Sequence, residues 1–174
     1  MSDCSVLHPA IQGCVECCRR SELLLDTVSD EKFRRLDESG QSIGAHLRHG
    51  LDHMVCFVRG IESGEIRYNE RDRDIVIEQS PSEFRQALRS ASTLIQAIPA
   101  QRLGDTVLIT DVAAPESGAV TVSSTLEREL MFLSSHMIHH LAVIEHICRK
   151  AGLELPNDFS LAYSTATYRA ANAG

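Results

Sequence analysis

Apolar side chains recur every three or four residues along four long stretches of this chain, and this spacing restricts the fold more than any other feature. Residues at that interval lie on one face of an α-helix, where they can pack into a core. Serine and proline near the starts of these stretches, and glycine after their ends, favour the same interpretation. The four predicted helices span residues 9–28, 42–63, 81–98 and 124–151.

Capping signals mark two of the helix starts. Ser80 begins a Ser-Pro-Ser-Glu run, which combines a capping box with a proline at the first helical position. Ser124 begins a second Ser-x-x-Glu capping box, and Gly152 follows the last predicted helix. We therefore expect the fourth helix to begin at Ser124 and to end just before Gly152.

The composition suits helices packed on helices. A length of 174 residues is typical of one domain with one core, and only 5% of the residues are aromatic, with no tryptophan. Residues 106–110 and 119–122 flank a Pro-Glu-Ser-Gly run, which predicts a short β-hairpin. We predict an all-α, antiparallel four-helix bundle with long crossover loops, forming a single domain over residues 1–174 with a C-terminal tail at 152–174.

The charge pattern argues against a polyanion as partner. The formal net charge is −7, and the basic residues are scattered, often beside acidic ones as in residues 70–74. Phosphate contacts require clustered lysine and arginine, so we expect no nucleic-acid partner. No run of about 18 apolar residues is present, so we expect no membrane span. The N-terminal residues lack a basic stretch followed by an apolar one, and we expect a cytoplasmic protein.

The six cysteines are expected to be reduced thiols, because disulfides are rare in the cytosol. They are Cys4, Cys14, Cys17, Cys18, Cys56 and Cys148. The CxxC run that ends at Cys17 lies inside the first predicted helix and has no second CxxC to complete a zinc site. We interpret these side chains as buried or bystander residues.

Six of the eight histidines fall in two clusters, each inside a predicted helix. They are His46, His49 and His53 in the second helix, and His136, His139 and His140 in the fourth. His136 and His140 are four residues apart, so one metal ion can bind both rings on one helix face. The helical periodicity directs His136 and His140 toward the bundle interior, whereas His139 lies nearer the edge. The second-helix histidines line one flank of its apolar stripe.

Convergent buried imidazoles are costly unless their nitrogens are satisfied. A metal ion would satisfy them; the alternative is that each ring bonds a backbone carbonyl or a hydroxyl. A di-iron site requires glutamates in Glu-x-x-His motifs, and neither cluster has an inward-facing one. The pattern therefore favours a mononuclear site with three histidines and open positions. Such a site suits Zn, Ni, Fe or Co, and the spacing does not choose among them.

The two histidine clusters resemble those of a known family. Residues 42–53 (SIGAHLRHGLDH) and 130–144 (LMFLSSHMIHHLAVI) are similar to segments of the DinB/YfiT-like superfamily of four-helix bundles. Members carry one metal-binding histidine on the second helix and an HxxxH motif on the last. The resemblance covers nearly the whole chain and implies His49, His136 and His140 as metal ligands. Residues 155–165 also resemble a C-terminal segment of some members, but lack its Gly and Pro.

The resemblance implies several activities. Some relatives are S-transferases that use mycothiol or bacillithiol, and others are isomerases or metal-dependent hydrolases. We therefore expect a mononuclear metal-dependent enzyme acting on a small molecule, with the metal activating water or a low-molecular-weight thiol. The alternative is a non-catalytic bundle that binds a metal or ligand, or a dimerisation module. An open coordination site with a polar pocket favours the enzyme, whereas a closed four-ligand site that includes His53 favours a structural role.

Other side chains are weaker candidates. His53 lies one turn after His49 and is a candidate for a catalytic role or the metal's surroundings. Glu78 is the loop carboxylate that we consider as a base. Arg71 and Arg73 are candidates to hold an anionic substrate, against the alternative of a solvated, mixed-charge loop. Asp52 is expected on a solvated helix face.

The fourth helix also carries a second apolar face, which includes Met131, Ile138 and Ala142. A monomeric bundle does not bury such a face, whereas a dimer does. Dimers are also frequent in the family that the chain resembles. We therefore predict a homodimer with Met131 and Ile138 at or near its interface.

Overall fold

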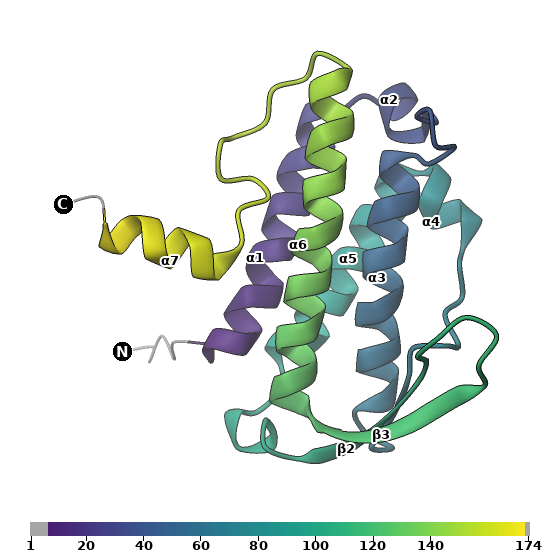
Figure 1. Cartoon of the computed structure of the whole chain (residues 1–174), viewed down its shortest axis with the longest axis vertical. Helices are drawn as coiled ribbons and strands as arrows, with labels where there is room; N and C mark the ends of the chain where they lie inside the picture. Colours follow the sequence, from purple (N-terminus) through teal and green to yellow (C-terminus); the bar gives the residue numbers. More distant parts are fainter. Residues whose placement is uncertain (1–6, 173–174) are drawn as a thin grey trace.

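The computed structural model describes residues 7–172. Four long helices lie side by side: α1 (Pro9–Thr27), α3 (Ile43–Gly60), α5 (Pro81–Gln96) and α6 (Leu126–Lys150) (Figure 1). Helix α6 packs against α1 and α3, and α5 packs against the same two helices. The predicted four-helix bundle is therefore confirmed.

Two of these helices run one way along the bundle and two run the other way. In Figure 1, α1 and α6 run upward, whereas α3 and α5 run downward. The chain that follows α3 must therefore return along the outside of the bundle before α5 begins. It passes through strand β1 (Glu65–Arg67) and helix α4 (Ile75–Gln79), and it is one of the long crossovers that we predicted.

Side-chain caps start the helices close to the predicted positions. The hydroxyl of Ser42 accepts the Ala45 N–H at 3.0 Å, and Ser80 caps α5 in the same way. The fourth long helix differs, because its cap is Thr125 rather than Ser124. Ser124 instead belongs to strand β3, and its hydroxyl donates a 2.6 Å hydrogen bond to the buried carboxylate of Glu129. Ser124 thus bonds Glu129 instead of capping the helix.

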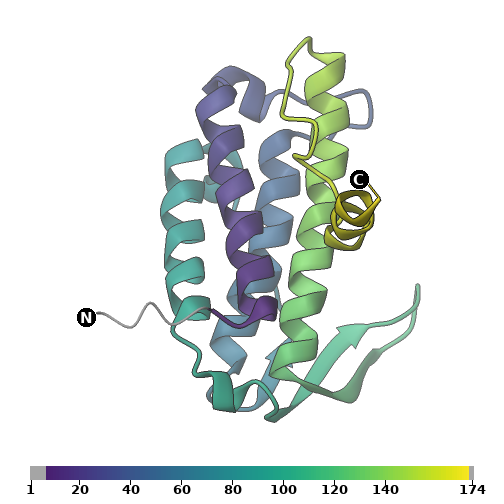
Figure 2. The ribbon, with the colours of Figure 1, turned by 90° about the vertical axis from the view of Figure 1, so that its left-hand side faces the viewer.

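The β-hairpin is confirmed and is longer than predicted. Strands β2 (Thr106–Val112) and β3 (Ala119–Thr125) pair in antiparallel fashion, and the hairpin projects from one end of the bundle (Figure 2). Strand β1 adds a parallel partner for β2, which the sequence pattern did not predict because it is only 3 residues long. The short helices α2 (Asp30–Arg34) and η1 (Ala100–Arg102) were also not predicted.

The apolar stripes form the core as expected. On α6 the apolar residues that recur at this spacing form a buried stripe: Leu126, Leu130, Leu133, Met137, Leu141, Ile144 and Cys148. The described cysteines are buried free thiols, whereas Cys4 lies outside the described residues. Burial raises the pKa of Cys17 to about 11 and that of Cys18 to about 12, so both are protonated and unreactive at neutral pH.

The C-terminal tail contains a further helix, α7 (Tyr163–Ala171). It lies beside α1 and α6, where a groove of about 860 Å³ is lined by both Met131 and Ile138. Met131 is 57% exposed, while Ile138 is partly buried and packs against the core. The homodimer therefore stays a prediction. Among the described helices, none is long and apolar enough to cross a membrane.

Candidate metal centre

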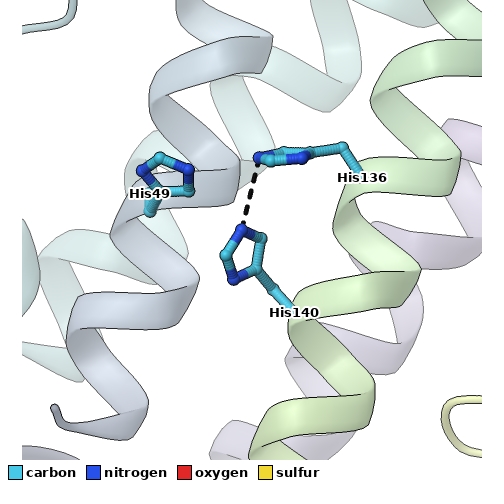
Figure 3. Close-up of side chains that lie close together, drawn as sticks. All are labelled: His49, His136 and His140. Atoms are coloured by element: carbon cyan, nitrogen blue, oxygen red, sulfur yellow. Dashed lines mark hydrogen bonds between the residues drawn. The ribbon is translucent and has the colours of Figure 1, made fainter. Parts of the chain in front are cut away.

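Three histidine rings converge between α3 and α6. His49 projects from α3, and His136 and His140 project from α6 toward it (Figure 3). One ring nitrogen from each residue lies within 4.8 Å of the other two. The Nε2 atoms of His136 and His140 are 3.2 Å apart, close to the separation of about 3.4 Å between two ligands of a tetrahedral ion with bonds near 2.1 Å.

Local packing brings the two helices together at this level. Gly50 follows His49 on α3, and Met137 follows His136 on α6. A Cβ atom at Gly50 would lie only 2.7 Å from the Met137 methyl group, so the absence of a side chain permits the close approach. On α6 the four-residue interval stacks His136 above His140. The four-residue spacing on α6 and the close approach of the helices at Gly50 thus bring the three rings to the same level along the bundle.

The environment keeps these rings neutral. Burial, together with the neighbouring His53 and His136, lowers the pKa of His49 to about 3. Burial likewise lowers the pKa of His136 to about 4 and that of His140 to about 3. Each ring therefore keeps a lone pair at pH 7, which is the form that binds a metal ion.

His53 lies beside the centre with a different hydrogen-bonding pattern. Its ring centroid is 4.3 Å from that of His136 and 4.8 Å from that of His49. Its Nδ1 donates a 2.9 Å hydrogen bond to the backbone carbonyl of His49, so its Nε2 carries the lone pair. That Nε2 lies 3.5 Å from Nη1 of Arg71. In the described part of the chain, His49, His136 and His140 thus surround the centre, and His53 lies beside them.

The two candidate arginines lie in different surroundings. Arg71 is mostly buried, with a side chain that is 17% exposed, and it donates to the Tyr68 carbonyl and approaches Asp111 at 4.0 Å. Arg73 is exposed in the same loop. The structure therefore brings Arg71, rather than Arg73, to the histidines.

The two acidic candidates belong to one ion-pair cluster. Arg48 donates to Asp52 at 2.8 Å and to Glu78 at 3.2 Å. The expectation of a solvated Asp52 is wrong: the residue is 6% exposed, because the ion pair with Arg48 permits its burial. Glu78 lies in α4, and the same arginine engages its carboxylate.

Several residues around the centre were not singled out from the sequence. The ring of Phe132 stacks on that of His136, with centroids 5.5 Å apart. Tyr68 lies beside the rings of His53 and Phe132, and its hydroxyl donates a 2.9 Å hydrogen bond to Glu129. The position of Phe132, four residues before His136, was the available signal. Tyr68 and Glu129 are joined only by tertiary structure, 61 residues apart.

These lowered pKa values give an expected pH dependence for the metal-free protein. As pH falls below about 6.5, the unfolded chain takes up protons at these histidines while the folded chain does not. The folded state should therefore lose stability steadily between about pH 6.5 and pH 4. Urea unfolding at pH 7.0 and 5.0 measures this, and the His140→Phe variant should show a smaller loss. Equal or greater stability at pH 5.0 in the wild type would contradict the expectation.

Comparison with known sequences covers part of the chain. No protein-family model matches the sequence. The chain is 34% identical over 102 residues to FK506-binding protein 5 from Rhizopus delemar, a match that covers 58% of this chain. It spans only 26% of that relative, about a quarter of its length.

A solved structure is similar over most of the chain. YfiT from Bacillus subtilis, described as a probable metal-dependent hydrolase with an unusual four-helix bundle topology, superposes with a TM-score of 0.59. The match covers 88% of this chain and 95% of YfiT, at 14% sequence identity. The expected resemblance is thus confirmed at the level of the fold, because the chain forms a four-helix bundle similar to that of YfiT.

Proposed function

We propose that this protein is a mononuclear metal-dependent enzyme that acts on a small molecule. His49, His136 and His140 would hold one divalent ion. The observation that carries the proposal is the convergence of three neutral imidazoles from two helices within 4.8 Å. The likeness to YfiT supports it, because that protein is described as a probable metal-dependent hydrolase.

The donor set suits a transition metal. Three imidazoles without a carboxylate in the group favour Zn, Ni, Fe or Co over Mg or Ca. When bound, such an ion supplies Lewis acidity, which lowers the pKa of water or of a thiol. Three protein ligands leave a position for a substrate, as catalytic sites require. His53 borders the ligands without closing the site, which favours the enzyme over a structural metal.

The loop around Arg71 suggests how a substrate is held. Two of its buried polar atoms, Nε of Arg71 and Oδ1 of Asn69, have no hydrogen-bond partner within the described part of the chain. A buried arginine beside the histidines is suited to bind a carboxylate or phosphate. We therefore propose that the substrate carries an anionic group bound by Arg71. Arg73, which is exposed in the same loop, would help to attract that anionic group.

Nearby side chains differ in their capacity to accept a proton. The ring of His53 is 4.3 Å from that of His136 between centroids, and its lone pair is on Nε2, so His53 is the better candidate. Glu78 is held by Arg48 through a 3.2 Å ion pair, which reduces its availability. Hydrolysis is the first reaction that we propose, and transfer of a low-molecular-weight thiol is the second. Both use the same three ligands.

An activity screen with metal-loaded and metal-free protein tests the proposal. Anionic esters, amides and phosphoesters probe hydrolysis, and bacillithiol or mycothiol with an electrophile probes thiol transfer. We expect turnover that requires metal and falls at least about 100-fold in His49→Ala, with the exposed His139→Ala as matched control. Arg71→Gln should mainly raise KM for anionic substrates. Stoichiometric metal binding without turnover across this panel would favour the non-catalytic alternative.

A further inference from the structure

Both ring nitrogens of His140 have a neighbour. Its Nε2 lies 3.2 Å from Nε2 of His136, toward the three-histidine group. Its Nδ1 lies 3.2 Å from Nδ1 of His46, a residue on α3 that is not part of that group. The centroids of the His46 and His140 rings are 5.4 Å apart. His46 therefore contacts the rear of a proposed ligand, on the side away from the centre.

The chemistry of imidazole assigns roles to this contact. If Nε2 of His140 binds a metal ion, the proton of the neutral ring must be on Nδ1. That N–H can then donate to Nδ1 of His46, provided that His46 carries its own proton on Nε2. Such a hydrogen bond fixes the tautomer and the orientation of a metal-binding histidine.

We propose that His46 is a positioning residue that accepts the Nδ1 proton of His140 and so presents its Nε2 to the ion. The inference rests on the proposed metal site and adds a residue to it. His46 lies one turn before His49 on α3, so one helix supplies a ligand and the support for another ligand. His46 is half-buried, which shields the hydrogen bond from water.

His139 also lies near His140 but does not have this geometry. The ring of His139 is 5.2 Å from that of His140 between centroids, but it stands edge-on and is exposed. It is adjacent in sequence and shares the same helix, so it serves as a matched control. A general effect of removing an imidazole near the site should appear equally in His139→Ala and in His46→Ala.

Metal affinity in a set of variants tests the proposal. We expect His46→Ala to bind Zn²⁺ and Co²⁺ about 10–100-fold more weakly than the wild type. His46→Asn should largely restore affinity, because the asparagine Oδ1 occupies nearly the same place as Nδ1 of histidine and accepts the same proton. The Co²⁺ absorption bands should shift in His46→Ala and return in His46→Asn. Thermal unfolding without metal verifies that each variant is folded.

A direct readout of the proton complements these titrations. Long-range ¹H–¹⁵N correlation spectra of the Zn²⁺-loaded protein should show His140 protonated at Nδ1. Wild-type affinity in His46→Ala, or a His140 ring protonated at Nε2, would overturn the role of His46 while leaving the three-histidine site intact. A wild-type protein that binds neither ion would overturn both proposals.

Discussion

His136→Ala should lose the rise in melting temperature that metal ions give the wild-type protein. An ion that binds only the folded state at 100 times its Kd adds about 2.7 kcal/mol of stability. For a chain of this size, that corresponds to a rise of about 5–10 °C. Removal of one of three ligands should weaken binding about 1000-fold, so the variant should show almost no rise at the same metal concentration.

The metal-free His136→Ala protein should remain folded. His136 lies at the edge of the core, and the apolar stripes of the four helices do not include it. The matched variant His139→Ala removes an exposed ring of the same helix and should keep the full metal-induced rise. An undiminished rise in His136→Ala would remove that residue from the site. Unfolding of the metal-free wild type at room temperature would instead indicate a structural metal.

Gly44→Ala should destabilise the protein by about 3 kcal/mol or more. A Cβ atom at this position would lie 2.1 Å from the backbone oxygen of Glu78 and 2.6 Å from the ring of Phe33. Alanine is ordinarily favoured over glycine within a helix by about 1 kcal/mol, so the steric overlap must outweigh that gain. Backbone cannot rotate away as a flexible side chain can, and α4 would therefore have to shift from α3.

Urea unfolding of Gly44→Ala and Gly104→Ala measures this effect. Gly104 is exposed and has no atom within 4 Å of an added Cβ, so Gly104→Ala should change stability by less than about 0.5 kcal/mol. Near wild-type stability in Gly44→Ala would show that α4 does not pack tightly against α3. Because α4 carries Glu78, such a result would also weaken the assignment of the Arg48 ion-pair cluster.

The elements set by local sequence could be predicted, and those set by tertiary contacts could not. The stripe from Leu126 to Cys148 identified α6 and its buried face, because helical periodicity is a local property. Strand β1 is 3 residues long and exists through its pairing with β2, which is more than 40 residues away. Helix α7 likewise depends on its contacts, since the Tyr163 hydroxyl donates to the Gly13 carbonyl at 2.6 Å.

The same distinction between local sequence and tertiary contacts applies to the candidate site. The four-residue interval between His136 and His140 placed both rings on one face, and the structure brings His49 to them. The ion pair of Asp52 with Arg48, one turn away on α3, is local, but the burial of Asp52 also involves the packing of α4, whose Glu78 binds the same arginine. The hydrogen bond from Tyr68 to Glu129 joins residues whose proximity depends on the crossover after α3. The helical phase placed His46 on one flank of the apolar stripe of its helix, but its contact with Nδ1 of His140 required the structure.

The most direct test is the metal content of the wild-type protein, purified without metal-affinity resin and without added chelator. Elemental analysis should find one transition-metal ion per chain, or metal-free protein should take up one equivalent of Zn²⁺ or Co²⁺. The His49→Ala and His140→Ala variants should lose this ion, and His139→Ala should retain it. A folded wild-type protein that neither carries nor binds such an ion, or a stoichiometry unchanged in His49→Ala and His140→Ala, would contradict the three-histidine site.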